Sequence, residues 1–369
     1  MTNITNNNII QEILYRLNVG AEIEISLLKK VFDSFFLNNK SKTNDVQMGA
    51  ILTGIMARGP KKEEIEALLN SVFKLDNFNP KKRKKIKLPK GSILVGAIGS
   101  GKKGVKTMNI STPALLTAAS LGAYTAKAVS HSTSSLTGSA DFLEMVGCKL
   151  NIPLEEMEKI ILKTRFGAFK IEGLLPNFNY LYGKKFLVPH ALSFGLAALA
   201  SPIKYDNLLY GLAHPDVELS IEVLKHFGVR NAMVASSTHD GIHYLDEMGV
   251  YGKTKIIGIQ KGKIGKLKVF NPLKDLKLPT YGPRDICEGK DVKENITLSL
   301  NVLKGRGDKA REDIVAINAG TVLYLANMAA GLEEGYNLAK KALEEGLPYK
   351  KLVEFIKATG GNINKLKEF

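Results

Sequence analysis

A cluster of glycines and lysines follows a short apolar run in the first third of the chain. The run spans residues 93–98, and three glycines come within the next six positions. Glycine lets a backbone approach a ligand closely, and loop amides beside lysine side chains favour an anion, most often a phosphate. The stretch predicts a buried strand and a phosphate-binding loop, with a lysine-rich surface turn as the alternative. The glycines are Gly99, Gly101 and Gly104, and the lysines between them are Lys102 and Lys103.

A helix is expected directly after this loop. Ser111 and Thr112 precede Pro113. Thr112 suits the N-cap, and Pro113 suits the first helical turn, where a missing N–H costs nothing. The amides at a helix N-terminus are further donors for an anion. The order of strand, loop and helix therefore predicts a phosphate site.

Two kinds of phosphate loop compete for this stretch. Residues 96–102 match the first part of a P-loop, but Lys103 stands where that motif needs a hydroxyl for the metal. Residues 99–112 resemble instead the loop of the anthranilate phosphoribosyltransferase family (glycosyltransferase family 3), in which Gly-Thr-Gly-Gly-Asp-Gly is followed by Asn-Ile-Ser-Thr. The second motif is complete here as residues 109–112, whereas the family's Asp is replaced by Lys103.

Other segments carry the same resemblance. Lys127 matches the lysine of a Lys-His-Gly-Asn-Arg signature, but Ser130 and His131 replace its Asn and Arg. The block at 138–141 is the family's Gly-Ser-Ala-Asp, and residues 245–247 match an acidic pair that holds magnesium. An ungapped count places Lys184 where the family has an Arg that binds the carboxylate of the acceptor.

The resemblance implies roles for these residues. No catalytic residue is assigned, because cleavage at an anomeric carbon passes through an oxocarbenium-like transition state that needs positioning and charge stabilisation rather than a protein nucleophile. Mg²⁺ is the implied cofactor, with Ser111, Asp246 and Glu247 as its ligands. The acceptor is expected at Ser130, His131 and Lys184. Phosphoribosyl pyrophosphate is expected at Gly99, Gly101, Lys102, Lys103, Thr107, Asn109, Ser111, Thr112, Lys127, Ser135 and Ser139.

Composition limits the partners and the compartment. The chain has 52 Lys and Arg against 36 Asp and Glu, a formal charge of +16, which favours a polyphosphate or nucleic acid. The lysine-rich run at 81–90 is interpreted as a solvated linker, or as a segment that attracts a polyanion. Only two cysteines occur, which excludes a disulfide framework, and no unbroken apolar stretch reaches about 18 residues. We expect a cytoplasmic protein without a membrane segment.

Hydrophobic periodicity and the resemblance together predict an α/β fold with two domains. Apolar residues recur at helical spacing over the first 75 residues, and strand and helix patterns alternate from residue 205. We predict a small all-helical domain (1–90 and 155–198) and a large α/β domain (91–154 and 199–369). The large domain should hold a central, mainly parallel sheet, with the ligand cleft at the hinge. The resemblance implies a homodimer.

The predicted function is magnesium-dependent transfer of phosphoribose to an aromatic or heterocyclic acceptor. Because the acceptor positions are altered, we expect an acceptor other than anthranilate. One alternative is a non-catalytic member of the fold that binds nucleic acid through a basic cleft. Another is a divergent anthranilate phosphoribosyltransferase of tryptophan biosynthesis.

Overall fold

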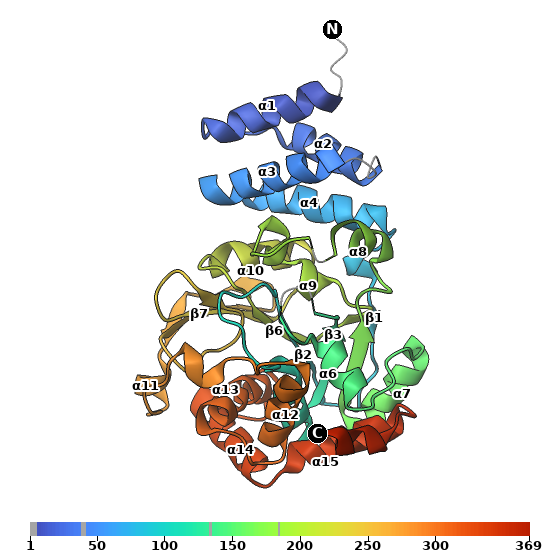
Figure 1. Cartoon of the computed structure of the whole chain (residues 1–369), viewed down its shortest axis with the longest axis vertical. Coiled ribbons are helices and arrows are strands. Elements are labelled where there is room, and N and C mark those ends of the chain that lie inside the picture. Colours follow the sequence, from blue (N-terminus) through green and yellow to red (C-terminus); the bar gives the residue numbers. More distant parts are fainter. Residues whose placement is uncertain (1–5, 38–41, 133–134, 184) are drawn as a thin grey trace.

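The N-terminal helices form a separate layer at one end of the molecule. The structure is a computed structural model that describes residues 6–37, 42–132, 135–183 and 185–369. Figure 1 shows the N-terminal helices stacked above the rest of the chain. Their apolar faces meet in a core that includes Phe32, Phe35 and Ile55, as their helical spacing predicts. The helices are α1 (Asn6–Asn18), α2 (Ile25–Leu37), α3 (Lys42–Arg58) and α4 (Lys62–Leu75).

A mainly parallel sheet is the centre of the larger part. Its strand order is β10-β9-β7-β6-β2-β3-β4, and the five strands from β7 to β4 run parallel. The predicted α/β fold with a helical N-terminal region is confirmed. The parallel strands are β2 (Leu94–Gly99), β3 (Tyr124–Val129), β4 (Phe166–Lys170), β6 (Asn207–Gly211) and β7 (Ala232–Thr238). The antiparallel strands are β8 (Tyr244–Leu245), β9 (Lys253–Gln260), β10 (Lys263–Ile264) and β11 (Lys268–Phe270).

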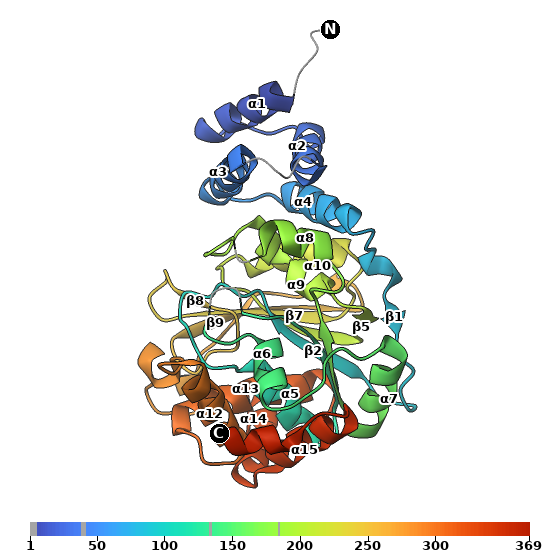
Figure 2. The ribbon, with the colours of Figure 1, turned by 45° about the vertical axis from the view of Figure 1, so that its right-hand side comes forward.

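Helices cover both faces of this sheet, which explains the almost unbroken apolar runs of its strands. Figure 2 shows the C-terminal helices below the sheet and α8 to α10 between the sheet and the N-terminal layer. The helices below or beside the sheet are α5 (Ser111–Ser120), α6 (Ser139–Met145), α7 (Leu154–Thr164), α11 (Pro272–Asp275), α12 (Val292–Leu303), α13 (Lys309–Leu325), α14 (Leu332–Glu344) and α15 (Leu347–Ala358). Those above are α8 (Pro176–Tyr182), α9 (Leu196–Leu199) and α10 (Val217–His226). Short 3₁₀ helices are η1 (Pro80–Lys82), η2 (Ala191–Phe194), η3 (Pro283–Ile286) and η4 (Ile363–Glu368).

The segment predicted to return to the helical domain is shared between the sheet and the N-terminal layer in the structure. We predicted that residues 155–198 join that domain and are mainly helical. Instead, α7 packs on β3 and β4, and β4 pairs with β3 along the edge of the sheet. Within this segment, α8 and η2 do contact α4 of the N-terminal layer. The segment Phe166–Lys170 has only four non-charged residues in a row before its lysine, which is too short for periodicity to distinguish a buried strand from a buried helix.

Another small sheet joins the two parts of the chain. β1 (Lys84–Lys85) pairs in parallel with β5 (Ile203–Lys204). β1 lies on the connection from α4 to β2, and β5 lies on the connection from α9 to β6. Two connections that are far apart in sequence therefore run side by side here.

Candidate active site

The predicted site residues gather around one cavity of about 480 Å³. It lies at the carboxyl ends of β2 and β3, and residues from 171–200 form its opposite wall. Thr112 is buried behind the lining, and Lys184 lies outside the described residues. The predicted residues on the lining are Gly99, Gly101, Lys102, Lys103, Thr107, Asn109, Ser111, Lys127, Ser130, His131, Ser135, Ser139, Asp246 and Glu247.

The beginning of α5 differs from the predicted cap. The helix begins at Ser111 after Ile110, and Thr112 lies in the first turn, so the prediction that Thr112 is the N-cap is wrong. Both hydroxyls accept hydrogen bonds from Lys127, whose Nζ is 2.8 Å from Ser111 Oγ and 3.3 Å from Thr112 Oγ1. A buried ammonium must be hydrogen-bonded. The hydroxyls of Ser111 and Thr112 serve as its acceptors instead of capping the helix.

Lys127 brings a buried positive charge to the cavity. It sits in β3 and is 4 % exposed. Burial lowers its pKa to about 8, although the carboxylates of Glu247 and Asp246 oppose that shift. An ammonium in this position can donate hydrogen bonds to an anion in a region shielded from water.

Two glycines make the seat of Asp246. Gly99 and Gly211 lie opposite each other at the ends of β2 and β6. A Cβ on Gly99 would lie 2.3 Å from Asp246 Oδ2, and one on Gly211 would lie 1.5 Å from the backbone oxygen of Asp246. The amide of Gly101 donates to Asp246 Oδ2 at 2.7 Å. Because both glycines lack a side chain, the carboxylate of Asp246 can approach the ends of β2 and β6 and accept the hydrogen bond from Gly101.

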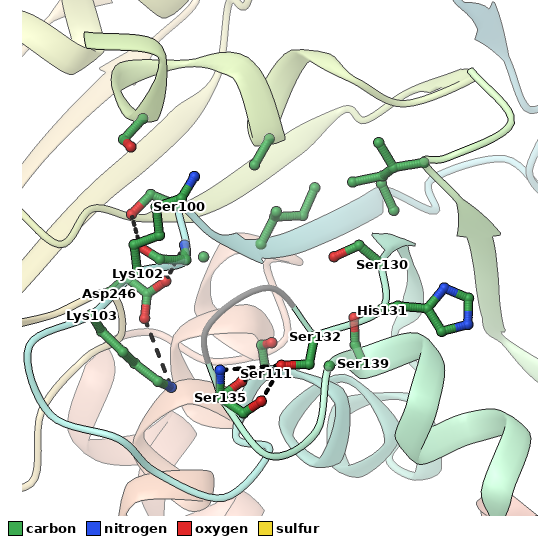
Figure 3. A pocket seen from close by; sticks show the side chains of 18 of the residues that line it. Ser100, Lys102, Lys103, Ser111, Ser130, His131, Ser132, Ser135, Ser139 and Asp246 are labelled. Carbon is green, nitrogen blue, oxygen red and sulfur yellow. Dashed lines mark hydrogen bonds and ion pairs between the residues drawn. The ribbon is translucent and has the colours of Figure 1, made fainter. Parts of the chain in front are cut away.

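Lys103 turns toward Asp246, as Figure 3 shows. Its Nζ lies 3.4 Å from Glu247 Oε2 and 3.8 Å from Asp246 Oδ1. Burial disfavours the charge of Lys103, but Glu247 and Asp246 outweigh burial and raise its pKa. Burial, followed by the charge of Asp246, raises the pKa of Glu247, while Lys103 opposes that increase.

The three predicted magnesium ligands each face an ammonium group. Ser111 accepts a hydrogen bond from Lys127, and Asp246 and Glu247 contact Lys103. Asp246 Oδ1 is buried without a hydrogen-bond partner, but Lys103 faces it. Among the described residues, no group of three or more His, Cys, Asp or Glu side chains could hold a metal ion. As arranged, these oxygens do not fit a divalent cation.

The described parts of the serine-rich loop (130–132 and 135–138) are shaped by hydrogen bonds to their backbone. Asp141 accepts from the amides of Ser132 and Gly138, both at 2.7 Å. Ser135 Oγ donates to the Thr137 carbonyl at 3.2 Å, and Ser139 is the first residue of α6. Figure 3 shows Ser132, Ser135 and Ser139 beside the cavity that they line.

Asn109 is tied to the serine loop from the other side. Thr137 Oγ1 donates to Asn109 Oδ1 at 2.8 Å and accepts from Asn295 Nδ2 at 2.6 Å. Asn295 is fully buried in α12. The chain thus couples the glycine-rich loop and the serine loop through one hydroxyl.

Ser130 and His131, the acceptor residues predicted from the altered signature, point in different directions. Figure 3 shows Ser130 directed toward the cavity and the ring of His131 directed away from it. The ring nitrogens of His131 lie 3.2 Å from Glu172 Oε1 and 3.1 Å from Glu144 Oε2. Because carboxylates occupy both nitrogens, His131 is poorly suited to receive an acidic acceptor.

His190 is a cavity residue that the sequence analysis missed. It lies just before η2, and its Nε2 is 3.2 Å from Lys102 Nζ. Burial and the charge of Lys102 lower the pKa of His190 well below its usual value. Burial also lowers the pKa of Lys102 to about 8. The sequence does carry a signal for this residue. His190 stands between Val188-Pro189 and Ala191-Leu192, and a single imidazole in an apolar run is a candidate for a buried position.

The middle of the basic run, Arg83 to Lys85, makes contacts within the chain. Lys84 Nζ lies 2.7 Å from Glu158 Oε2, and Lys85 Nζ lies 3.2 Å from Asp206 Oδ1. Arg83 donates to the carbonyls of Pro80 and Ala198. These contacts favour a linker and give no support to a nucleic-acid surface.

Within the described parts of the chain, no helix has the length and apolar character needed to cross a membrane.

Comparison with known proteins identifies the family. The model of the glycosyl transferase family a/b domain matches residues 91–349, more than half of the chain. The anthranilate phosphoribosyltransferase of Herminiimonas arsenicoxydans is 31% identical over 320 residues, covering 85% of this chain and 87% of the relative. That of Petrotoga mobilis is 30% identical over 322 residues, covering 87% and 89%.

Solved structures agree with this assignment at the level of the fold. Anthranilate phosphoribosyltransferase from Thermus thermophilus superposes with a TM-score of 0.73 at 24% identity, covering 94% of this chain and 99% of that one. The Saccharomyces cerevisiae enzyme in complex with PRPP and Mg gives 0.74 at 17% identity, covering 95% and 98%. With the matched family domain and these relatives, the chain belongs to the anthranilate phosphoribosyltransferase family of glycosyl transferases.

Proposed function

We propose that this protein transfers phosphoribose from phosphoribosyl pyrophosphate to anthranilate. The observation that carries the proposal is the convergence of the glycine-rich loop, buried Lys127 and the serine loop on one cavity. The curated relatives that match most of the chain are named anthranilate phosphoribosyltransferases. This similarity favours anthranilate over the different acceptor that the altered signature led us to expect.

The pyrophosphate end of the donor is proposed to lie at the loop and the beginning of α5. The bond between the anomeric carbon and pyrophosphate breaks, and negative charge builds on the leaving group. Lys102, Lys127 and the loop amides would stabilise that charge without changing position. In the yeast structure Mg is found together with PRPP, and an ion bound to the phosphates of the donor would offset part of their charge.

The acceptor is proposed to lie against residues 171–200, opposite the phosphate loop. Its amine forms the new bond to the anomeric carbon and loses a proton, while pyrophosphate leaves. His190 is the candidate contact for the acceptor carboxylate. Its Nδ1 is buried without a hydrogen-bond partner, and Nε2 faces Lys102. An ammonium only donates, so Nε2 is the accepting atom and Nδ1 carries the proton of the neutral ring.

The test is the formation of phosphoribosyl anthranilate, followed by loss of anthranilate fluorescence with donor and Mg²⁺. We expect a specificity constant of at least about 10⁴ M⁻¹s⁻¹, the lower end of the usual enzyme range. Donor binding is measured separately by calorimetry. If the donor binds but anthranilate is not consumed, the acceptor assignment is wrong. If the donor does not bind, the proposed function fails altogether.

A further inference from the structure

Lys103 forms a buried ion cluster with the acidic pair. Its side chain is 14% exposed, compared with 4% for Asp246 and 7% for Glu247. Lys127 is also buried. Its ammonium is attracted by the carboxylates of Asp246 and Glu247 and repelled by the ammonium of Lys103. Buried charges are tolerated when they are paired, and here two ammonium groups accompany two carboxylates. The formal charges of these four side chains cancel, and Glu288 is a further acidic group that acts on Lys103.

The geometry gives a second reason why a divalent cation does not fit at Asp246 and Glu247. Mg²⁺ prefers six oxygen ligands at about 2.0–2.1 Å, so an ion on this pair must approach both carboxylates closely. Lys103 Nζ already lies 3.4 Å from Glu247 Oε2 and 3.8 Å from Asp246 Oδ1. The ammonium therefore occupies the approach to both side chains, and a metal ion there would be repelled by it. The backbone of Lys103 cannot retreat freely, because the amide of Gly101 is bonded to Asp246 and that of Gly104 to the Tyr244 carbonyl.

We propose that the ammonium of Lys103 replaces a divalent cation at Asp246 and Glu247. In this chain the acidic pair does not bind Mg²⁺; it holds Lys103 at the edge of the cavity, where the ammonium is a resident positive charge for the pyrophosphate group. This inference rests on the proposed function only in taking pyrophosphate as the ligand. A test of metal binding needs neither donor nor acceptor.

The experiment uses Mn²⁺ as the probe and the ligand-free protein, and measures binding from the loss of the free-ion paramagnetic resonance signal. The wild type is expected to show no site that depends on the acidic pair. K103D, which puts a third carboxylate beside Asp246 and Glu247, is expected to gain one Mn²⁺ site. The matched control is K106D, because Lys106 also lines the cavity and the charge change is equal. K106D should gain no such site.

Two metal-binding results would overturn the proposal. One is Mn²⁺ binding by the wild type that D246N or E247Q removes. The other is a folded K103D protein, verified by circular dichroism and thermal melting, that gains no site. Should K103D fail to fold, K103M decides the matter, because removal of the resident charge should weaken inorganic pyrophosphate binding in EDTA at least tenfold by calorimetry. An unchanged affinity in K103M would also refute the proposal.

These readouts are separate from the test of the proposed function. Wild-type turnover of the donor with anthranilate does not enter any of them. A wild-type protein that is active and binds Mn²⁺ through the acidic pair would refute only the inference about Lys103. A protein that shows the expected Mn²⁺ results but does not use the donor would refute only the proposed function.

Discussion

Lys102 and His190 connect the two walls of the cavity, with Lys102 Nζ 3.2 Å from His190 Nε2. Lys102 belongs to the loop after β2, and His190 precedes η2, which packs on α4. Lys102 also lies over the ring of Phe186, 5.5 Å from its centroid. The loop proposed to bind the donor is therefore in direct contact with the segment proposed to bind the acceptor.

Replacement of His190 by Phe is expected to weaken the acceptor site. If Nδ1 donates to the carboxylate of anthranilate, its loss removes one hydrogen bond to a charged group, worth about 1.5–3 kcal/mol. The KM for anthranilate should rise roughly 10- to 100-fold, since each 1.4 kcal/mol is a factor of ten. H190N, which keeps an N–H donor, is the matched control and should lose less. An equal loss in both variants would point to packing against Phe186 rather than to the hydrogen bond.

Pyrophosphate binding is expected to weaken above about pH 8. Burial lowers the pKa of Lys102 to about 8, so its ammonium loses a proton as the pH rises through that value. The charged form attracts the anion, and the neutral form does not. Calorimetry at about pH 7 and pH 9 should show the fall in affinity, with a smaller fall in K102M. A wild-type affinity that stays constant across this range would contradict the assignment of Lys102 to the donor.

The same shift predicts how stability changes with pH. The folded-state pKa of Lys102 is below the unfolded value, so the unfolded chain binds more protons between about pH 8 and 10.5. The free energy of unfolding should therefore rise with pH in this window by more in the wild type than in K102M. Chemical denaturation of both proteins at the two ends of the window measures the difference.

Lys127→Met should reduce anion binding without unfolding the protein. The variant keeps an apolar side chain of similar length in β3 and removes the ammonium that donates to Ser111 and Thr112. The affinity for pyrophosphate should fall by about 1.5–3 kcal/mol, the usual worth of a hydrogen bond to a charged group. Lys170→Met is the control, because Lys170 pairs with Val129 at the end of the neighbouring strand but does not line the cavity. Equal losses in the two variants would show that the effect is not local.

Gly211→Ala should damage both stability and binding. The new Cβ would lie 1.5 Å from the backbone oxygen of Asp246, so β6 or the segment carrying the acidic pair has to move. Overpacking of a dense site costs typically 1–3 kcal/mol and here should reach about 3 kcal/mol or more, because backbone is displaced. Gly258→Ala in β9 is the control, since its Cβ would be 3.7 Å from the nearest atom. Denaturant unfolding of both variants tests the difference.

Local sequence patterns predicted the parts of the fold that depend on neighbouring residues. The strand, loop and helix around Gly99 have a clear apolar run and turn residues, and the structure contains them. β4 was missed because its buried run is too short to show a period. Thr112 was misassigned because the group that attracts its hydroxyl, Lys127, comes from the next strand.

The cavity was predictable where motifs were intact and unpredictable where the chemistry arises from tertiary contacts. Residues along the glycine-rich loop and the serine loop do line the cavity. No local pattern shows that Lys103 would face Asp246 and Glu247, which are more than 140 positions away in the chain. The direction of the His131 ring depends on Glu144 and Glu172, and the contact of His190 with Lys102 depends on how the two walls meet.

The seat made by Gly99 and Gly211 has a consequence for how this sequence can evolve. Both glycines leave space that Asp246 fills, and they face each other across neighbouring strands. A side chain at either glycine is compatible with the fold only if the segment carrying Asp246 is withdrawn. Drift at these three positions should therefore be coupled, so that homologues with a larger residue at either glycine have lost the acidic residue or changed the length of its loop.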